Sequence, residues 1–368
     1  MKILLVMLEG HGGMFQHAVL LCNKLSENHK VTAVVPSGAE KEFFSQSVNV
    51  IEMPIGDTIR NTAINLFKIK PLIDFFKTLN ETDADIIHFI NVYNPWPTSL
   101  LPLLRRKFGI VISIPEGKLH AGMTNRFEML ISREIHMLFA DVILTLSVYD
   151  RLTLSELAKK KKFFVIPHPV NTFFSKYAKQ VDPIPNSILF FGAPILYKGL
   201  EFLIRAYPLV KQAIPDAKLI LAGRGNFDWI AKQLSPTILD SVILDNRFIP
   251  PDLVAEYFQK STIVVLPYIE IDHTGNVPIA YAFNKPIVVT ELISGNVERE
   301  RTGLVVPPRD GKALAQAIIR LLRDKELRFN IQKNIPQYVK RHMTLDVIAE
   351  RHIKAYEAAL VESSERRN

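Results

Sequence analysis

The stretch from residue 262 to residue 290 constrains the fold of this chain more than any other. Its β-branched apolar run TIVVLP is typical of a buried strand, and a polar turn with Thr274, Gly275 and Asn276 follows. A helical pattern then begins with Pro278 in its first turn, and a second apolar run, PIVVT, comes after it. Strand, helix and strand in this order predict a βαβ unit, with the polar turn at the carboxyl end of its first strand.

This polar turn is the first candidate site. In open parallel sheets ligands bind at the carboxyl ends of the strands, and a helix N-terminus there offers unpaired N–H groups to an anion such as phosphate. The turn also carries Glu270, Asp272 and His273, which is more hydrogen-bonding capacity than a turn requires. An empty turn of an ordinary α/β protein is the alternative.

Chain length and periodicity predict two domains, each built from alternating strands and helices. A chain of 368 residues is too long for one ordinary core, and its 48% apolar and 22% charged residues are typical of a well-packed protein. Strands alternate with helices in both halves, but the periodicity stops between Asn171 and Asn186, where Asp182, Pro183 and Pro185 indicate a linker. We therefore expect an α/β fold of two doubly wound Rossmann-like domains that face each other across a cleft. The expected parts are residues 1–172, a linker at 173–186, residues 187–340, and a C-terminal helix at 341–368 that packs back towards the N-terminal domain.

The first strand of the chain ends in a glycine-rich turn that contains Gly12 and Gly13. The spacing is not the dinucleotide fingerprint, because the later glycine and the closing acidic residue are missing. Either the glycines let the backbone approach a ligand or the facing domain, or they form a tight turn without a ligand.

The net charge of +8 favours an anionic partner, either a sugar nucleotide or an acidic lipid surface. Nucleic acid is not expected, because the sequence has no zinc spacing and no aromatic RNA-binding motif. Cys22 cannot form an internal disulfide, and the N-terminal run breaks too early for a signal peptide, so we expect a cytoplasmic protein. The helical stretch 60–79, with Lys68, Lys70 and Lys77, is either a membrane-surface helix or a core-facing helix with solvated lysines. The lysine run 159–162 is expected to be a solvated helix end, and contact with acidic lipid is the alternative.

An ordered set of motifs in the second half resembles a known family. FFGAPILYKGLEFLIRAYPLV, LILAGRG, NRFIPPDLVAEYF, VVLPY, AYAFNKPIVVT and RTGLVVPPRD follow one another as in the donor-binding half of the retaining glycosyltransferases of family 4, which have the GT-B architecture. The resemblance is strongest over residues 187–324. It is looser in the N-terminal half, through Gly12, Gly13, His120 and the IPHPV stretch.

The resemblance implies a nucleoside diphosphate sugar as co-substrate, with no cofactor and no metal. It makes Lys198 the cation that faces the diphosphate, with the amides of Thr274, Gly275 and Asn276 on the same phosphates. Glu270 or Asp272 would orient the sugar and His120 would contact the sugar or the acceptor. The remaining implied residues are Gly12, Gly13, Arg224, Phe248, Ile249 and Glu298 for the donor, and Glu116 for the acceptor.

The sequence also departs from the family pattern. The family has two glutamates separated by seven residues in this loop and helix, but the second acidic position falls on Ala280 or Ile279, depending on the register. Ala193 stands where many relatives have arginine.

The resemblance implies a retaining, metal-independent hexosyltransferase of polysaccharide or glycolipid biosynthesis. It would act on a glycan or lipid-linked acceptor, in the cytoplasm or as a peripheral protein at the inner face of the membrane. A catalytically silent GT-B binding or scaffold subunit and a sugar-nucleotide epimerase or hydrolase are the alternatives.

Overall fold

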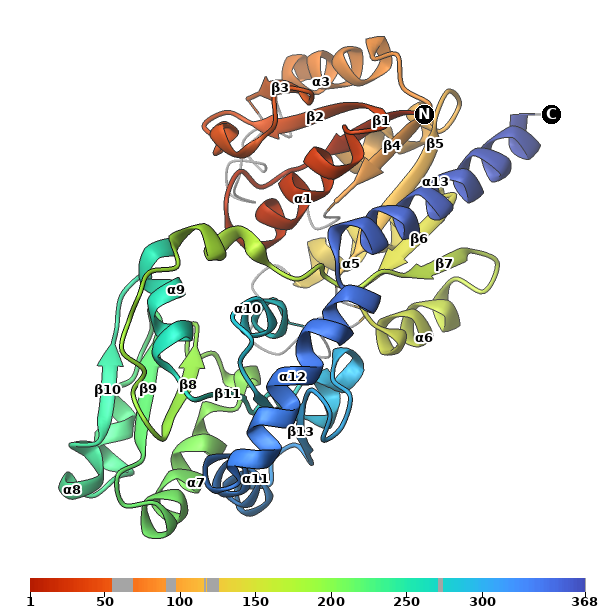
Figure 1. Cartoon of the computed structure of the whole chain (residues 1–368). Coiled ribbons are helices and arrows are strands. Elements are labelled where there is room, and N and C mark those ends of the chain that lie inside the picture. Colours follow the sequence, from red (N-terminus) through yellow and green to blue (C-terminus); the bar gives the residue numbers. More distant parts are fainter. Residues whose placement is uncertain (55–68, 91–96, 116, 118–125, 271–273, 368) are drawn as a thin grey trace. The chain divides into compact units, whose positions relative to one another are not determined.

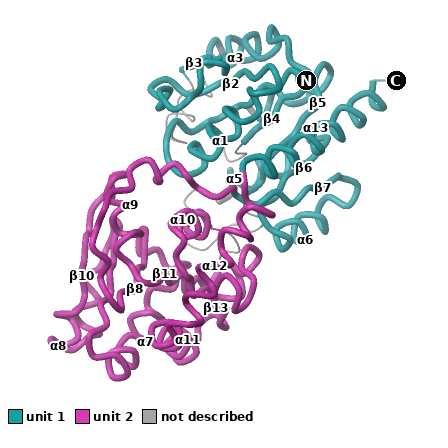
Figure 2. Tube along the Cα trace, viewed as in Figure 1, with its two compact units in different colours: residues 1–119, 123–168, 345–368 teal, residues 120–122, 169–344 magenta. Residues whose placement is uncertain are grey.

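The computed structural model describes residues 1–54, 69–90, 97–115, 117, 126–270 and 274–367 (Figure 1). They group into two compact units, which we describe one at a time (Figure 2). Unit 1 contains the described residues of 1–168 together with 345–368, and unit 2 contains the described residues of 169–344.

Unit 1 is built on a seven-stranded parallel sheet with the order β3-β2-β1-β4-β5-β6-β7. The central strands are buried along almost their whole length because helices cover both faces of the sheet. The strands are β1 (Lys2–Val6), β2 (Lys30–Pro36), β3 (Asn49–Met53), β4 (Ile86–Phe89), β5 (Gly109–Ile114), β6 (Val142–Thr145) and β7 (Lys162–Val165).

The helices of unit 1 form two layers. On one face, α1 (Gly12–Leu25) and α13 (Leu345–Arg367) pack against the sheet and against each other. The other face is covered by α3 (Ile69–Glu81), α4 (Leu101–Leu104), α5 (Arg126–Phe139) and α6 (Val148–Leu157). Two short 3-10 turns, η1 (Lys41–Phe43) and η2 (Pro97–Leu100), complete the unit.

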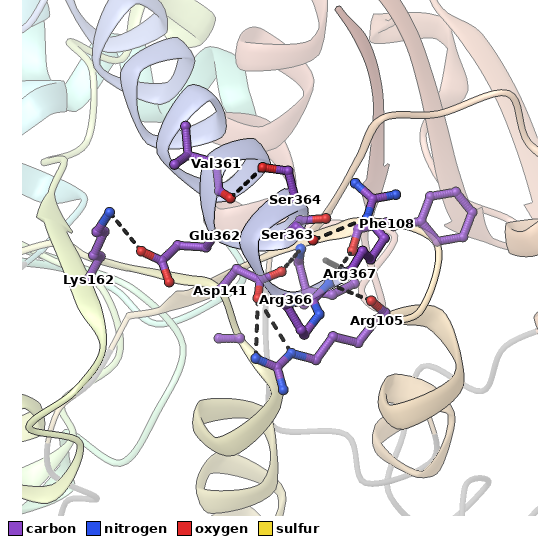
Figure 3. A network of polar contacts seen from close by, with 12 residues as sticks. Arg105, Phe108, Asp141, Lys162, Val361, Glu362, Ser363, Ser364, Arg366 and Arg367 are labelled. Atoms are coloured by element: carbon purple, nitrogen blue, oxygen red, sulfur yellow. Dashed lines mark hydrogen bonds and ion pairs between the residues drawn. The ribbon is translucent and has the colours of Figure 1, made fainter.

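The last turn of α13 is fixed to unit 1 by a buried carboxylate (Figure 3). Asp141 forms ion pairs with Arg366 and Arg105, and its second oxygen accepts a hydrogen bond from the backbone N–H of Ile110 at 2.9 Å. Arg366 also donates to the carbonyl oxygens of Arg105 and Phe108. Because these groups come from three separate parts of the chain, the network ties α13 to the edge where β5 and β6 begin.

Unit 2 is built on a six-stranded parallel sheet with the order β10-β9-β8-β11-β12-β13. Its strands are β8 (Ser187–Phe191), β9 (Lys218–Ala222), β10 (Val242–Asp245), β11 (Ile263–Leu266), β12 (Ile287–Thr290) and β13 (Gly303–Val306). Its α-helices are α7 (Leu200–Ala213), α8 (Pro236–Leu239), α9 (Pro251–Lys260), α10 (Asn276–Ala282), α11 (Gly311–Arg323) and α12 (Lys325–His342). Its 3-10 turns are η3 (Thr172–Tyr177), η4 (Leu196–Lys198), η5 (Asp228–Lys232) and η6 (Glu291–Asn296).

The predicted fold class is confirmed, and β11, α10 and β12 form the predicted βαβ unit. α10 ends in a left-handed Asn284 (φ 53°), a conformation that asparagine tolerates, and Lys285 N–H closes the end by donating to Ala280 O at 2.8 Å. Among the described residues, no helix is long and apolar enough to span a bilayer.

The structure adds local detail at three places. The C-terminal helix expected at residues 341–368 is α13, which begins at Leu345, because the chain breaks at a buried Met343 whose carbonyl accepts the N–H of Val170 at 2.7 Å. Part of the segment expected as a linker forms η3, where Phe173 and Phe174 are buried. The expectation of a solvated helix end was wrong for Lys161, which is only partly exposed because its ammonium donates to Leu138 O and Ala140 O near the end of α5.

Candidate functional site

The candidate site lies at the topological switch point of the unit 2 sheet. From β8 the chain moves to β9 and β10 on one side, and then returns to β11, β12 and β13 on the other. The loops after β8 and β11 therefore diverge from neighbouring strands at the carboxyl edge, which is where open α/β sheets bind ligands. These loops carry Lys198 and the turn of Thr274, Gly275 and Asn276.

Glycines let the loops after β8, β9 and β11 approach one another. Gly192 has φ 107°, and a Cβ there would collide with Lys198 Nζ. A Cβ on Gly223 would collide with the backbone of Gly192, and one on Gly199 (φ 62°) would collide with the carbonyl of Pro267. Side chains at Gly199 and Gly223 would push the loops apart, whereas Gly192 is required because its positive φ disfavours other residues.

Lys198 is the cation of this edge. It ends η4, its side chain is partly buried, and its ammonium lies over the open face of Gly192. Burial lowers the pKa of Lys198 to about 8. Within the described part of the chain, its Nζ has no hydrogen bond or ion pair, so desolvation of the charge is not offset there by a protein acceptor. Such an ammonium is suited to an incoming anion.

The turn after β11 is organised by the buried Tyr268. Thr274 Oγ1 donates to Tyr268 Oη at 3.3 Å, and Asn276 Nδ2 donates to Tyr268 Oη at 3.1 Å and to Phe191 O at 2.9 Å. Burial raises the pKa of Tyr268, so the phenol stays neutral. The side chain of Asn276 therefore ties the turn to the end of β8.

The backbone N–H of Asn276 is also engaged, because it donates to Thr274 Oγ1 at 3.1 Å. Of the N–H groups expected to face an anion, this one is used within the turn itself. The family's missing second carboxylate would fall on Ile279 or Ala280, and both are buried in α10.

Sequence reasoning did not single out Arg309. It follows β13 and lies 3.7 Å from the carboxylate of Glu270, which follows β11. Its φ of 62° is left-handed, which is unusual for a side chain of this size. Its position after the last strand, at the same edge as Lys198, was the available sequence signal.

The other expected donor residues are spread along unit 2. Arg224 is exposed between Gly223 and Gly225, whereas Phe248 beyond β10 is 76% exposed and the neighbouring Ile249 is buried. The Glu298 carboxylate is paired with Arg301 at 3.2 Å, and among the described residues it forms no hydrogen bond or ion pair with Lys198 or Asn276. Gly12 and Gly13 form the first turn of α1 in unit 1. Glu116, His120 and Asp272 lie outside the described residues.

Two doubly wound Rossmann-like units in one chain define the GT-B architecture, and comparison with known proteins agrees. Residues 185–324 match the family model described as glycosyl transferases group 1. Sucrose-phosphate synthase from Thermosynechococcus elongatus has a TM-score of 0.74 at 20% identity, over 97% of this chain and 98% of that one. Anabaena HepE, solved in complex with UDP, has a TM-score of 0.71 at 16% identity, over 96% and 99%. The chain therefore resembles group 1 glycosyltransferases of GT-B fold.

Among curated relatives, a phosphatidyl-myo-inositol mannosyltransferase of Mycobacterium leprae is 26% identical over 59% of this chain and 61% of its own length. The first relatives matched are covered over 45%, 58% and 61% of their own lengths.

Proposed function

We propose that this chain is a retaining glycosyltransferase. It would move a hexose from a nucleoside diphosphate sugar to a hydroxyl of a glycan or lipid-linked acceptor. The observation that carries the proposal is Lys198, a partly desolvated ammonium at the switch point of a sheet that matches the group 1 glycosyltransferase model.

The chemistry follows from where charge develops. As the sugar departs, negative charge grows on the diphosphate, and a cation already in place stabilises that charge without solvent reorganisation. We propose that Lys198 and the amides of Thr274 and Gly275 supply this stabilisation, because the Asn276 N–H is used within the turn, and that no metal is obligatory. Glu270 or Asp272 would orient the sugar hydroxyls. Arg224, Phe248, Ile249 and Glu298 would complete the donor site in unit 2.

We assign the donor to unit 2 and the acceptor to unit 1. Gly12 and Gly13 of unit 1 would meet the donor, and Glu116 and His120 would serve the acceptor. Retention would appear in the product as the donor's own anomeric configuration, which proton NMR reads from the anomeric coupling.

The comparisons narrow the donors to try first. The fold neighbour HepE from Anabaena was also solved in complex with UDP-glucose, and the relative from Mycobacterium leprae is a phosphatidyl-myo-inositol mannosyltransferase. UDP-glucose and GDP-mannose, with their free nucleotides, are therefore the first probes.

A membrane-bound acceptor is supported by the surface of unit 1, and we propose that this unit contacts an anionic membrane from the cytoplasmic side. Nine exposed large apolar side chains lie on the layer formed by α3, α4, α5 and α6, whereas Val361 is the one found on α13 in the described part of the unit. The nine are Ile73, Leu103, Leu130, Ile131, Leu138, Val148, Tyr149, Leu152 and Leu157. Exposed Arg151, Lys159 and Lys160 add positive charge beside α6.

A thermal-shift titration tests the donor site. A nucleotide at a hundredfold its dissociation constant adds about 2.7 kcal/mol of stability, which raises Tm by several degrees. We expect UDP or GDP to shift the wild type and the Lys312→Met control, in which an exposed α11 lysine is changed, but not Lys198→Met. If both lysine variants keep the shift, Lys198 is not the phosphate cation.

A catalytically silent GT-B subunit is the second candidate, favoured by the burial of Ile279 and Ala280 where the family has a carboxylate. It predicts no thermal shift and no sugar transfer with any donor. Turnover of a nucleotide sugar in the presence of an acceptor would contradict it. An epimerase or hydrolase would instead convert the nucleotide sugar without an acceptor.

A further inference from the structure

Arg309 is held in a conformation that needs an explanation. Four residues other than glycine have positive φ in the described part of the chain, and two of them are asparagines, which tolerate it. Arg309 (φ 62°) is not a residue that tolerates this conformation well, because its Cβ crowds the following carbonyl. It follows Pro307 and Pro308 and precedes Asp310, whose carboxylate caps α11 by accepting the N–H of Ala313 at 2.9 Å.

The side chain of Arg309 reaches the candidate sugar site from this backbone. Its guanidinium lies 3.7 Å from Glu270 Oε1, and the two side chains are 59% and 30% exposed. A separation of 3.7 Å is longer than a hydrogen bond. The arginine therefore attracts the carboxylate while leaving its lone pairs available to other donors.

We propose that Arg309 is a positioning residue for the donor sugar. Its charge holds the Glu270 carboxylate at the carboxyl edge of the unit 2 sheet, and Glu270 then accepts hydrogen bonds from sugar hydroxyls. The inference rests on the proposed function, since it needs a nucleotide sugar in this site. It adds a residue to which sequence reasoning gave no role, and it gives a reason for an arginine at a position where glycine would be free of strain.

The different proposed roles of Lys198 and Arg309 can be separated by comparing two ligands. Lys198 contacts the diphosphate, which a free nucleotide and a nucleotide sugar share, whereas Arg309 acts on the sugar alone. Titrations with UDP and UDP-glucose, or with GDP and GDP-mannose, should therefore respond differently. We expect Arg309→Gly and Arg309→Ala to weaken binding of the nucleotide sugar about fivefold, which is the upper end of what a half-exposed ion pair contributes. Binding of the free nucleotide should be unchanged.

Three comparisons between variants separate a positioning role from a purely structural one. Arg309→Gly should melt about 2 °C above Arg309→Ala, because only glycine relieves the left-handed backbone. Arg309→Lys should retain most of the nucleotide-sugar affinity, because it keeps the charge. In Arg309→Gly combined with Glu270→Gln, the loss should equal that of Glu270→Gln alone.

Glu300→Gly is the matched control. Glu300 also has positive φ (59°), but its carboxylate pairs with Arg320 away from Glu270. We expect this variant to bind the nucleotide sugar as the wild type does. If Arg309→Gly does so too, or if the losses in the double variant add, the positioning role is refuted while the glycosyltransferase proposal stands. If the wild type binds UDP and GDP but neither nucleotide sugar, the positioning role fails with the proposed reaction.

Discussion

The Lys198 ammonium shows how a binding group can reduce the stability of the protein that carries it. Its pKa of about 8 lies below the ordinary value of 10.5 because burial removes water from the charged form. The folded chain therefore binds this proton less tightly than the unfolded chain. The resulting penalty is present in full below pH 8 and is relieved as the pH rises from 8 towards 10.5.

The lowered pKa of Lys198 predicts that, as the pH rises, the stability of the wild type relative to Lys198→Met increases while its affinity for a nucleotide sugar falls. At pH 7 we expect Lys198→Met to melt a few degrees above the wild type, and we expect the gap to close by pH 10 as the wild-type lysine loses its proton. The affinity of the wild type for UDP-glucose or GDP-mannose should be constant below pH 8 and then fall by up to about tenfold per pH unit. Calorimetric titrations and melts at several pH values measure both. A variant that melts below the wild type at pH 7 would contradict the burial argument.

At the scale of an element, helix α13 also depends on a buried charge, which fixes its last turn. Asp141 is nearly inaccessible, and it holds Arg366, Arg105 and the N–H of Ile110 together. Removing one partner of a buried ion pair is strongly destabilising, because the other charge is left buried without compensation. The ion pair between Glu362 and Lys162, one turn earlier on α13, is 35% and 50% exposed and contributes little.

These two ion pairs of α13 predict unequal losses. We expect Asp141→Ala to lower the free energy of unfolding by about 3 kcal/mol, because it leaves two guanidinium groups and one N–H without their acceptor. Glu362→Ala should cost about 0.5 kcal/mol or less. Urea unfolding followed by tryptophan fluorescence and circular dichroism measures both, and equal losses would show that the buried network does not hold the helix.

At the scale of the whole molecule, the sequence predicted what short-range patterns determine. The alternation of strands and helices in both halves and the βαβ unit of β11, α10 and β12 agree with the expectation, because each element is a continuous apolar or amphipathic run between breakers. The pairing of Asp141 with Arg366, the burial of Lys161 and the contact of Glu270 with Arg309 could not be predicted. Each of them joins residues that only the tertiary fold brings together.

The apolar layer of unit 1 gives a prediction for the whole protein in solution. We expect the protein to sediment with vesicles that contain acidic lipid, and we expect salt to weaken this binding. Little of the protein should sediment with neutral vesicles. Val148→Ser combined with Leu152→Ser should weaken this binding about tenfold, because two apolar side chains leave the interface. Phe329→Ser removes an equally exposed side chain (65%) from α12 in unit 2 and is the matched control. If the control loses as much as the double variant, the proposed face is wrong.

The position of α13 in the chain also affects how the protein is made. The helix covers one face of the unit 1 sheet, yet it follows unit 2 in the sequence. A ribosome that makes unit 1 first leaves the part of this face that α13 covers, beside α1, exposed until the whole of unit 2 has been synthesised. During translation, unit 2 can therefore complete its core before unit 1 does, and the N-terminal half is the part of the nascent chain that needs protection from aggregation.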